Sequence, residues 1–252
     1  MRLLLVPGLL ALVIIVSGCQ REPVREASAA RPANAHAVAS FAGRVFRADY
    51  GDALCHLTAE DWARRETASP GPTPKAAEPG VLASTQGRVR RENGVLIVSG
   101  ARFADNDEEG DASVAYAYLG RLPDARFDVL LGRHWEWMTW YLVDAKGAQV
   151  GLGGPPVASP DGRSFAATGD DVEGESLNGV EIATHADGAF SHAEVQAFAA
   201  CDPRWIDNDT LEVKVLSEGM RGVAATPTTK PSDWKAARIV REGKGWKLVQ
   251  PA

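Results

Sequence analysis

The chain has 252 residues, of which 45% are hydrophobic, and a formal net charge of −6 at pH 7. This length and apolar content suit one folded domain, or one domain with a small appendage. The negative balance argues against a general binder of nucleic acid or of anionic membranes, because such proteins present a basic surface.

The N-terminus has the pattern of an export signal. A short basic start, Met1-Arg2, precedes an apolar run that ends at Val16-Ser17-Gly18-Cys19, and this order is typical of a secretory signal peptide. The apolar run is too short to span a bilayer, which takes about 20 residues. The cysteine directly after the small pair resembles the bacterial lipobox, and the resemblance implies that residues 1–18 are removed and that Cys19 carries lipid. The alternative is an ordinary signal peptide, but the nearby Ala27-Ser28-Ala29 lies well past the apolar run.

The same resemblance implies a compartment. Two or more acyl chains on Cys19 would anchor the protein stably to the membrane, whereas one chain holds only marginally. Gln20 stands where Gram-negative lipoproteins retained in the inner membrane tend to have Asp, so the resemblance implies an outer-membrane protein that faces the periplasm. Residues 19–35 are charged and then rich in alanine, which predicts a flexible tether.

Lipid on Cys19 would leave two of the three cysteines. Cys55 and Cys201 are then a natural pair in an oxidising periplasm. In the chain-entropy model their disulfide would contribute up to about 5 kcal/mol. The alternative is a reactive thiol activated by the neighbouring His56. The chain has no C-x-x-C motif, and we predict a structural disulfide.

Residues 36–80 are predicted to form a small helical appendage and a proline-rich link. Val38, Phe41 and Val45 recur on one face of a helix, and Thr58-Ala59-Glu60-Asp61 precedes a second helix candidate. From Ser69 to Gly80 the chain is rich in proline and glycine, which predicts a link that continues neither element.

Residues 81–252 are predicted to be a β domain. A hairpin is expected over residues 87–102, with Asn93-Gly94 at its turn, and turns are expected at residues 144–147 and 242–245. Further strands are predicted over residues 112–122, 127–131, 135–143, 164–168, 179–184, 195–200, 210–216, 237–241 and 246–249. Short strands separated by regular turn signals predict a mainly β fold of antiparallel sheets.

One unit has a more specific order. Residues 141–182, with Gly153-Gly154-Pro155-Pro156 and Ser159-Pro160-Asp161-Gly162 within them, resemble one blade of a TolB-type or WD-like β-propeller. In such blades Ser-Pro-Asp-Gly is the turn between two strands. Residues 205–211 are similar to the start of a following blade. The strand region has room for at most about four blades of 40–45 residues. We therefore predict an open, propeller-related stack or a sandwich, preceded by the short helical piece.

An acidic segment is the best metal candidate. Asp105, Asp107, Glu109 and the following Gly110 match the start of an EF-hand calcium loop. The twelfth place is Tyr116 instead of Glu, and the flanks have the pattern of strands. A solvated hairpin loop is therefore the preferred interpretation, with bound calcium as the alternative and no other cofactor expected.

His134 and Glu136 would lie on one face of a strand, which is the arrangement that an acid–base pair needs. A surface pair without catalysis is preferred, since the chain has no G-x-S-x-G, H-E-x-x-H or P-loop motif. We expect no enzyme.

The tryptophans Trp135, Trp137 and Trp140 are candidates for a platform on which a glycan stacks. Core filling is the preferred interpretation, because buried aromatic side chains dominate β-sandwich cores. The expected function is that of a lipid-anchored envelope protein that binds another envelope protein or acts as a scaffold. The alternative is a module that binds a glycan or a small molecule.

Overall fold

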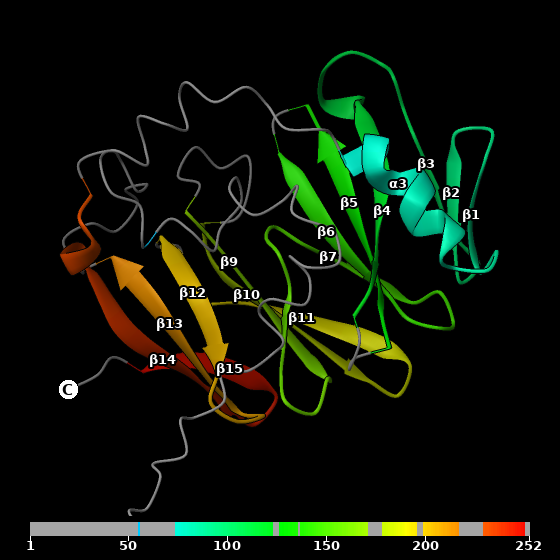
Figure 1. The fold of residues 1–252 in the computed structure, drawn as a ribbon. Coiled ribbons are helices and arrows are strands. Elements are labelled where there is room, and N and C mark those ends of the chain that lie inside the picture. The colour runs from blue at the N-terminus through cyan, green and yellow to red at the C-terminus, as the bar shows by residue number, and fades with distance from the viewer. Residues whose placement is uncertain are drawn as a thin grey trace, which may run out of the picture. The chain divides into compact units, whose positions relative to one another are not determined.

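The computed structural model describes Cys55 and residues 74–122, 126–135, 137–170, 178–195, 199–216 and 229–249 (Figure 1). Cys19, the predicted tether and, apart from Cys55, the helical part of the predicted appendage lie outside the described residues. The described residues belong to one compact unit, Pro32–Ala252. They form four antiparallel sheets and one α-helix, which confirms the predicted mainly β fold.

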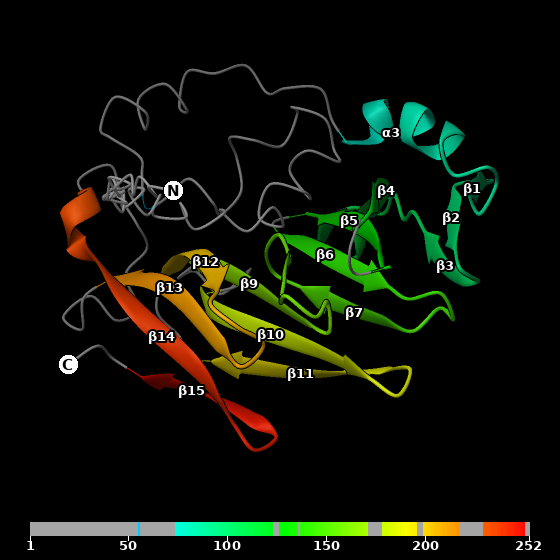
Figure 2. The same cartoon turned by 60° about the horizontal axis from the view of Figure 1, so that its bottom comes forward.

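Each sheet is a meander in which every strand pairs with the next one along the chain. Sheet A contains β1 (Val89–Glu92), β2 (Val95–Val98) and β3 (Ala101–Ala104). Sheet B contains β4 (Val114–Arg121), β5 (Asp128–His134), β6 (Met138–Val143) and β7 (Gln149–Leu152). Sheet C contains β8 (Val157–Ala158), β9 (Ser164–Asp170), β10 (Asn178–Ala186) and β11 (Ala189–Val195). Sheet D contains β12 (Ala200–Trp205), β13 (Thr210–Leu216), β14 (Trp234–Glu242) and β15 (Gly245–Val249), which run side by side in Figure 2.

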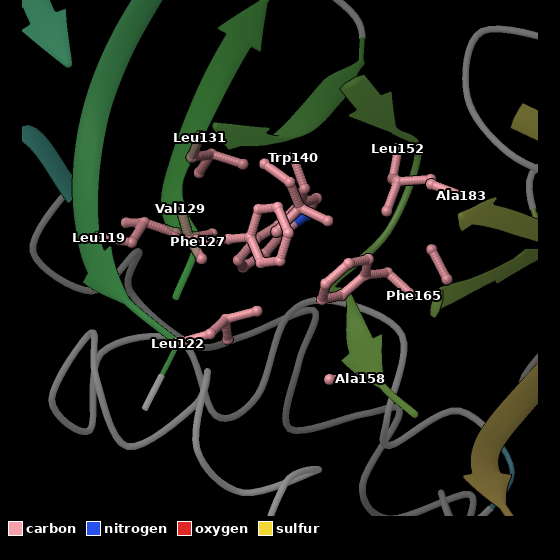
Figure 3. Close-up of a cluster of buried hydrophobic side chains, with 12 residues drawn as sticks. Leu119, Leu122, Phe127, Val129, Leu131, Trp140, Leu152, Ala158, Phe165 and Ala183 are labelled. Carbon is pink, nitrogen blue, oxygen red and sulfur yellow. The ribbon is translucent and has the colours of Figure 1, made fainter. Parts of the chain in front are cut away.

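The sheets pack face to face in chain order. Separate clusters of buried apolar side chains fill the A–B, B–C and C–D interfaces, and Figure 3 shows the B–C cluster. Side chains alternate across a strand, so sheets B and C can bury both faces. In β4, Tyr118 packs toward sheet A and Leu119 toward sheet C. In β9, Phe165 packs toward sheet B and Ala166 toward sheet D. This arrangement agrees with the predicted stack or sandwich of antiparallel sheets.

The stack ends at a charged face on sheet D. The inward positions of β13, among them Leu211 and Val213, are fully buried against sheet C. The alternate positions carry Glu212, which pairs with Arg204, and Lys214, whose Nζ lies 2.9 Å from Asp202 Oδ2. The charged pairs cover part of this face, since Cys201, Leu216 and Trp234 on the same side of the sheet are buried in a cluster with Cys55.

Sheet A contains one more turn than expected. Asn93 and Gly94 have φ values of 49° and 80°, as a type I′ hairpin turn requires, which confirms the predicted turn between β1 and β2. Ser99 and Gly100 repeat this geometry at 50° and 88°, so the predicted second strand is split into β2 and β3.

Other strand boundaries differ from the prediction for local reasons. The strand predicted to begin at Trp135 begins at Met138, because the chain first makes a turn closed by a hydrogen bond from His134 N to Trp137 O. Of the strand predicted over residues 195–200, Val195 ends β11 and Ala200 begins β12, and residues 196–198 lie outside the described residues.

The blade-like unit also needs correction. Residues up to Leu152 belong to sheet B, whereas those from Val157 belong to sheet C, so the unit is not one sheet. The chain changes sheets at Gly153-Gly154-Pro155-Pro156, where the prolines have no N–H for a ladder. The backbone approaches closely there, and a Cβ on Gly154 would lie 2.6 Å from the carbonyl oxygen of Thr168. Ser159-Pro160-Asp161-Gly162 does form the turn that joins two neighbouring strands, β8 and β9.

The prediction of a link up to Gly80 is wrong from Pro74, where helix α3 (Pro74–Ala83) begins. A proline inside a helix removes one backbone hydrogen bond, and Pro79 does so here. Tertiary contacts compensate for this loss. Val81 and Leu82 pack on the A–B cluster, and the side chain of Glu78 accepts a hydrogen bond from Tyr118 N of β4.

Candidate functional site

The turn between β5 and β6 carries the most exposed large hydrophobic side chain among the described residues. This turn, which we call the aromatic turn, consists of His134, Trp135 and Trp137 with the position between them. Trp135 is 62% exposed. The rings of His134 and Trp137 stack with centroids 4.8 Å apart and planes at 12°, and this stack holds the base of the turn.

His134 is not half of an acid–base pair on a strand. β5 ends at His134, so the alternation that would place residues 134 and 136 on one face does not apply, and Glu136 lies outside the described residues. Partial burial lowers the pKa of the His134 imidazole. Its Nε2 atom is buried, with no hydrogen-bond partner found in the described part of the chain. The neutral ring is therefore a stacking surface for Trp137.

The three predicted tryptophans do not form one platform. Trp140 lies in the B–C cluster and is 3% exposed, as the core interpretation predicts. Trp137 is partly buried under His134, and Trp135 alone projects from the turn. Sequence alternation could not separate them, because it treated a turn and a strand as one strand.

The acidic loop of residues 107–113 starts and ends beside the aromatic turn. Asn106 forms a β-bridge with Val114, and Val114 pairs with His134 on the other side. Asp107 and Glu109 are exposed in this loop. Asp105, the third calcium candidate, is turned away and accepts a hydrogen bond of 2.8 Å from Tyr116 N. In the described ranges no group of three His, Cys, Asp or Glu side chains is arranged to hold a metal ion.

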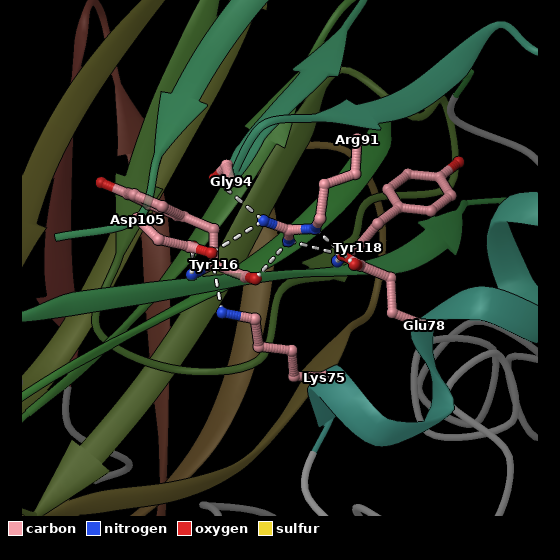
Figure 4. A network of polar contacts seen from close by, with 7 residues as sticks. All are labelled: Lys75, Glu78, Arg91, Gly94, Asp105, Tyr116 and Tyr118. Atoms are coloured by element: carbon pink, nitrogen blue, oxygen red, sulfur yellow. Dashed lines mark hydrogen bonds and ion pairs between the residues drawn. The ribbon is translucent and has the colours of Figure 1, made fainter. Parts of the chain in front are cut away.

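Asp105 belongs instead to a polar network that binds the free edge of β4 (Figure 4). Arg91 donates to both oxygens of Glu78, at 2.7 and 2.9 Å, and to Asp105 at 2.9 Å. Arg91 also donates to the carbonyl oxygens of Tyr116, at 2.6 Å, and of Gly94, at 3.2 Å. Side chains thus take the place of a neighbouring strand along this edge, which protects it from pairing with another chain.

Two polar pairs were not foreseen from the sequence. In sheet C, Glu181 accepts a hydrogen bond of 2.7 Å from Gly153 N, and His192 Nε2 lies 3.7 Å from its other oxygen. Burial raises the pKa of Glu181, against the opposing effect of those two partners. Between sheets B and C, His185 Nε2 lies 3.0 Å from Asp144 Oδ2. Asp144 and His185 are 41 residues apart, and Glu181 and His192 lie on the neighbouring strands β10 and β11, so both pairs depend on how strands pack or pair.

The predicted cysteine pair lies at disulfide distance. The Cα atoms of Cys55 and Cys201 are 6.1 Å apart, within the usual range of about 4.4–6.8 Å. Both side chains are buried in a small cluster with Ala199, Leu216 and Trp234. Cys55 therefore packs against sheet D, although it precedes all four sheets in the chain.

Comparison with models of protein families, with curated proteins and with solved structures finds no match to this chain. In the described ranges there is no helix long and apolar enough to cross a bilayer.

Proposed function

We propose that the protein is a lipid-anchored component of the bacterial envelope that binds another envelope protein without catalysis, through the aromatic turn. The observation that supports this most directly is the exposure of Trp135. Among the described residues only Ile206 and Val249, each 43% exposed, are other large hydrophobic side chains open to solvent. Tryptophan is enriched among the residues that dominate binding energy at protein interfaces.

The contacts within the aromatic turn also support a role in binding. Stacking of His134 on Trp137 and the hydrogen bond from His134 N to Trp137 O join the two sides of the turn. A surface ordered in advance loses less conformational entropy when a partner binds. Covering the ring of Trp135 would contribute about 2–3 kcal/mol.

Export and lipidation rest on the N-terminal pattern up to Cys19. The cysteine pair supports them, because a buried Cys55–Cys201 disulfide would be stable in an oxidising compartment. With Cys19 lipidated and the other two cysteines bonded, no free thiol is left in the mature chain.

The anchor is tested with Cys19→Ala, expressed in a bacterium that processes lipoproteins. We expect the wild-type chain in the membrane fraction with a mass increased by acyl groups, and the variant without that mass. An unmodified wild-type chain would contradict the anchor.

The binding surface is tested by placing a photo-crosslinking amino acid at position 135 and, as the matched control, at position 206. Ile206 is also an exposed hydrophobic residue but lies after β12 in sheet D. We expect a discrete crosslinked species from position 135, absent from position 206, and competed by excess wild-type protein but not by Trp135→Ala protein. Equal crosslinking from both positions would contradict the proposal.

Glycan binding is the second candidate, since an exposed indole ring also stacks on sugars. It would show as co-sedimentation of the protein with purified peptidoglycan that is lost in Trp135→Ala, without a crosslinked protein partner. The burial of Trp140 removes one ring from the platform that this candidate first assumed.

A further inference from the structure

We infer that the Cys55–Cys201 link makes sheet D the place where the N-terminal segment holds the folded body, and that it keeps sheets A, B and C out of the path of tension between the N-terminus and the chain after Cys201. This inference concerns the consequence of lipid anchoring and rests on the proposed function for its biological setting. Its physical content depends only on the two cysteines and the order of the sheets.

The first step is the position of the link in the chain. The loop that it closes has a sequence separation of 146 residues and contains helix α3 and sheets A, B and C entirely. Outside the loop lie the residues before Cys55 and the rest of sheet D. Cys201 is the second residue of β12 and pairs with Lys214 of β13.

The second step is the path of a pulling force. Tension between the N-terminus and any point of sheet D after Cys201 passes through the sulfur–sulfur bond and does not enter the loop. Without the bond, the first described element that the force meets is α3, followed by sheets A, B and C in series. The link therefore transfers the attachment from the first sheet of the stack to the last.

The third step is the position of the aromatic turn relative to sheet D. Sheet D is joined to sheet C by the C–D cluster and by a buried hydrogen bond of 2.8 Å from Trp205 Nε1 to Val157 O. The aromatic turn lies on sheet B, which has no share in that interface. Tension between the N-terminus and the chain after Cys201 therefore does not pass through the sheet that carries the aromatic turn.

The test is single-molecule force spectroscopy of the unlipidated mature chain, held by handles at residue 20 and at the C-terminus. The oxidised wild-type chain should unfold sheet D and then stop, because the loop carries no tension. Adding a reductant at constant force should then release a second extension of about 520 Å, from 146 residues at about 3.6 Å each. Cys55→Ala/Cys201→Ala should show the whole extension without reductant.

An oxidised wild-type chain that reaches the length of the double variant before reduction would overturn the inference. So would a second extension that needs no reductant. The wild-type chain alone decides the matter if the double variant fails to fold, since the step that depends on reductant is measured in the same molecule. The handles replace the lipid, so failure here is separate from failure of the Cys19 experiment.

Discussion

The B–C and A–B interfaces differ in how much of the contact between neighbouring sheets is polar. The B–C interface has the larger apolar cluster, with Phe165, Trp140 and Leu142 fully or almost fully buried at its centre, and His185 and Asp144 form a polar pair beside it. The A–B interface has a smaller apolar cluster, to which ion pairs of Arg91 and Arg88 with buried carboxylates are added. Sheet B thus meets a full sheet on one face and a three-stranded sheet with a helix on the other.

The difference shows how a helix can cover the free edge of a four-stranded sheet. Sheets B, C and D have four strands each and sheet A has three. Helix α3 lies beside β4 in both views of the fold, and its Glu78 bonds to that strand (Figures 1 and 2). A helix cannot form a ladder with a strand edge, so side-chain carboxylates and a guanidinium must satisfy the backbone groups. The A–B interface is therefore polar by necessity.

The largest expected effect is at the apolar interface. Phe165→Ala should lower the free energy of unfolding by about 3–5 kcal/mol, because it removes a fully buried ring and leaves a cavity. The substitution also removes the edge-on contact between the rings of Phe165 and Phe127, whose centroids are 4.9 Å apart. Urea unfolding followed by circular dichroism measures the loss. Phe165→Leu is the matched control and should cost clearly less, and equal costs would show that the site is loosely packed.

Glu78→Ala should cost about 3 kcal/mol, because it leaves Arg91 without its bidentate partner and Tyr118 N without an acceptor. The measurement is again urea unfolding. Arg90→Ala breaks the exposed pair with Glu92 and serves as the control, with an expected change below about 1 kcal/mol. If both variants lost the same small amount, the A–B interface would depend on its apolar cluster alone.

A smaller effect concerns how stability depends on pH through Asp144, which contacts His185 between sheets B and C. Burial alone would raise the pKa of Asp144, but the N–H groups of Lys146 and Ala148 and the contact with His185 outweigh it and hold the pKa below its ordinary value. At pH values near the ordinary pKa of an aspartate, the folded state therefore binds fewer protons than the unfolded state. The contribution to stability is complete above about pH 4 and is lost as the pH falls through the lowered pKa.

Asp144→Asn should therefore show a shallower fall in the free energy of unfolding between pH 5 and pH 3 than the wild-type protein. The measurement is urea unfolding at each pH. Parallel curves for the two proteins would show that the Asp144 carboxylate is not held in its charged form by these partners.

The sequence predicted what is local and failed where the cause is tertiary. Alternating side chains and Asn93-Gly94 predicted the strands and a hairpin that the structure confirms. Helix α3 could not be predicted, because its prolines argue against a helix and its support comes from Tyr118 N, 40 residues along the chain. The aromatic turn was predicted as part of a strand, since periodicity alone does not mark where His134 leaves the sheet. The Cys55–Cys201 pairing followed from counting cysteines, but its place on the last sheet did not.

The smallest expected effect on stability concerns the turn between β2 and β3 in sheet A. Ser99 occupies the first position of a type I′ turn at φ 50°, where asparagine is preferred, and Gly100 follows at 88°. The carbonyl oxygen of Ser99 would lie 3.0 Å from a Cβ placed on Gly147. This turn of sheet A therefore touches the β6–β7 turn of sheet B. Ser99→Asn should stabilise the protein by about 0.5 kcal/mol, because it favours the left-handed backbone without changing the contact. Thermal unfolding measures the gain, with Ser84→Asn on an exposed turn as the control. A gain that disappears in the Glu78→Ala background would mean that sheet A is ordered against sheet B only while the polar network is intact, and a gain that persists would mean that sheet A folds as a unit of its own.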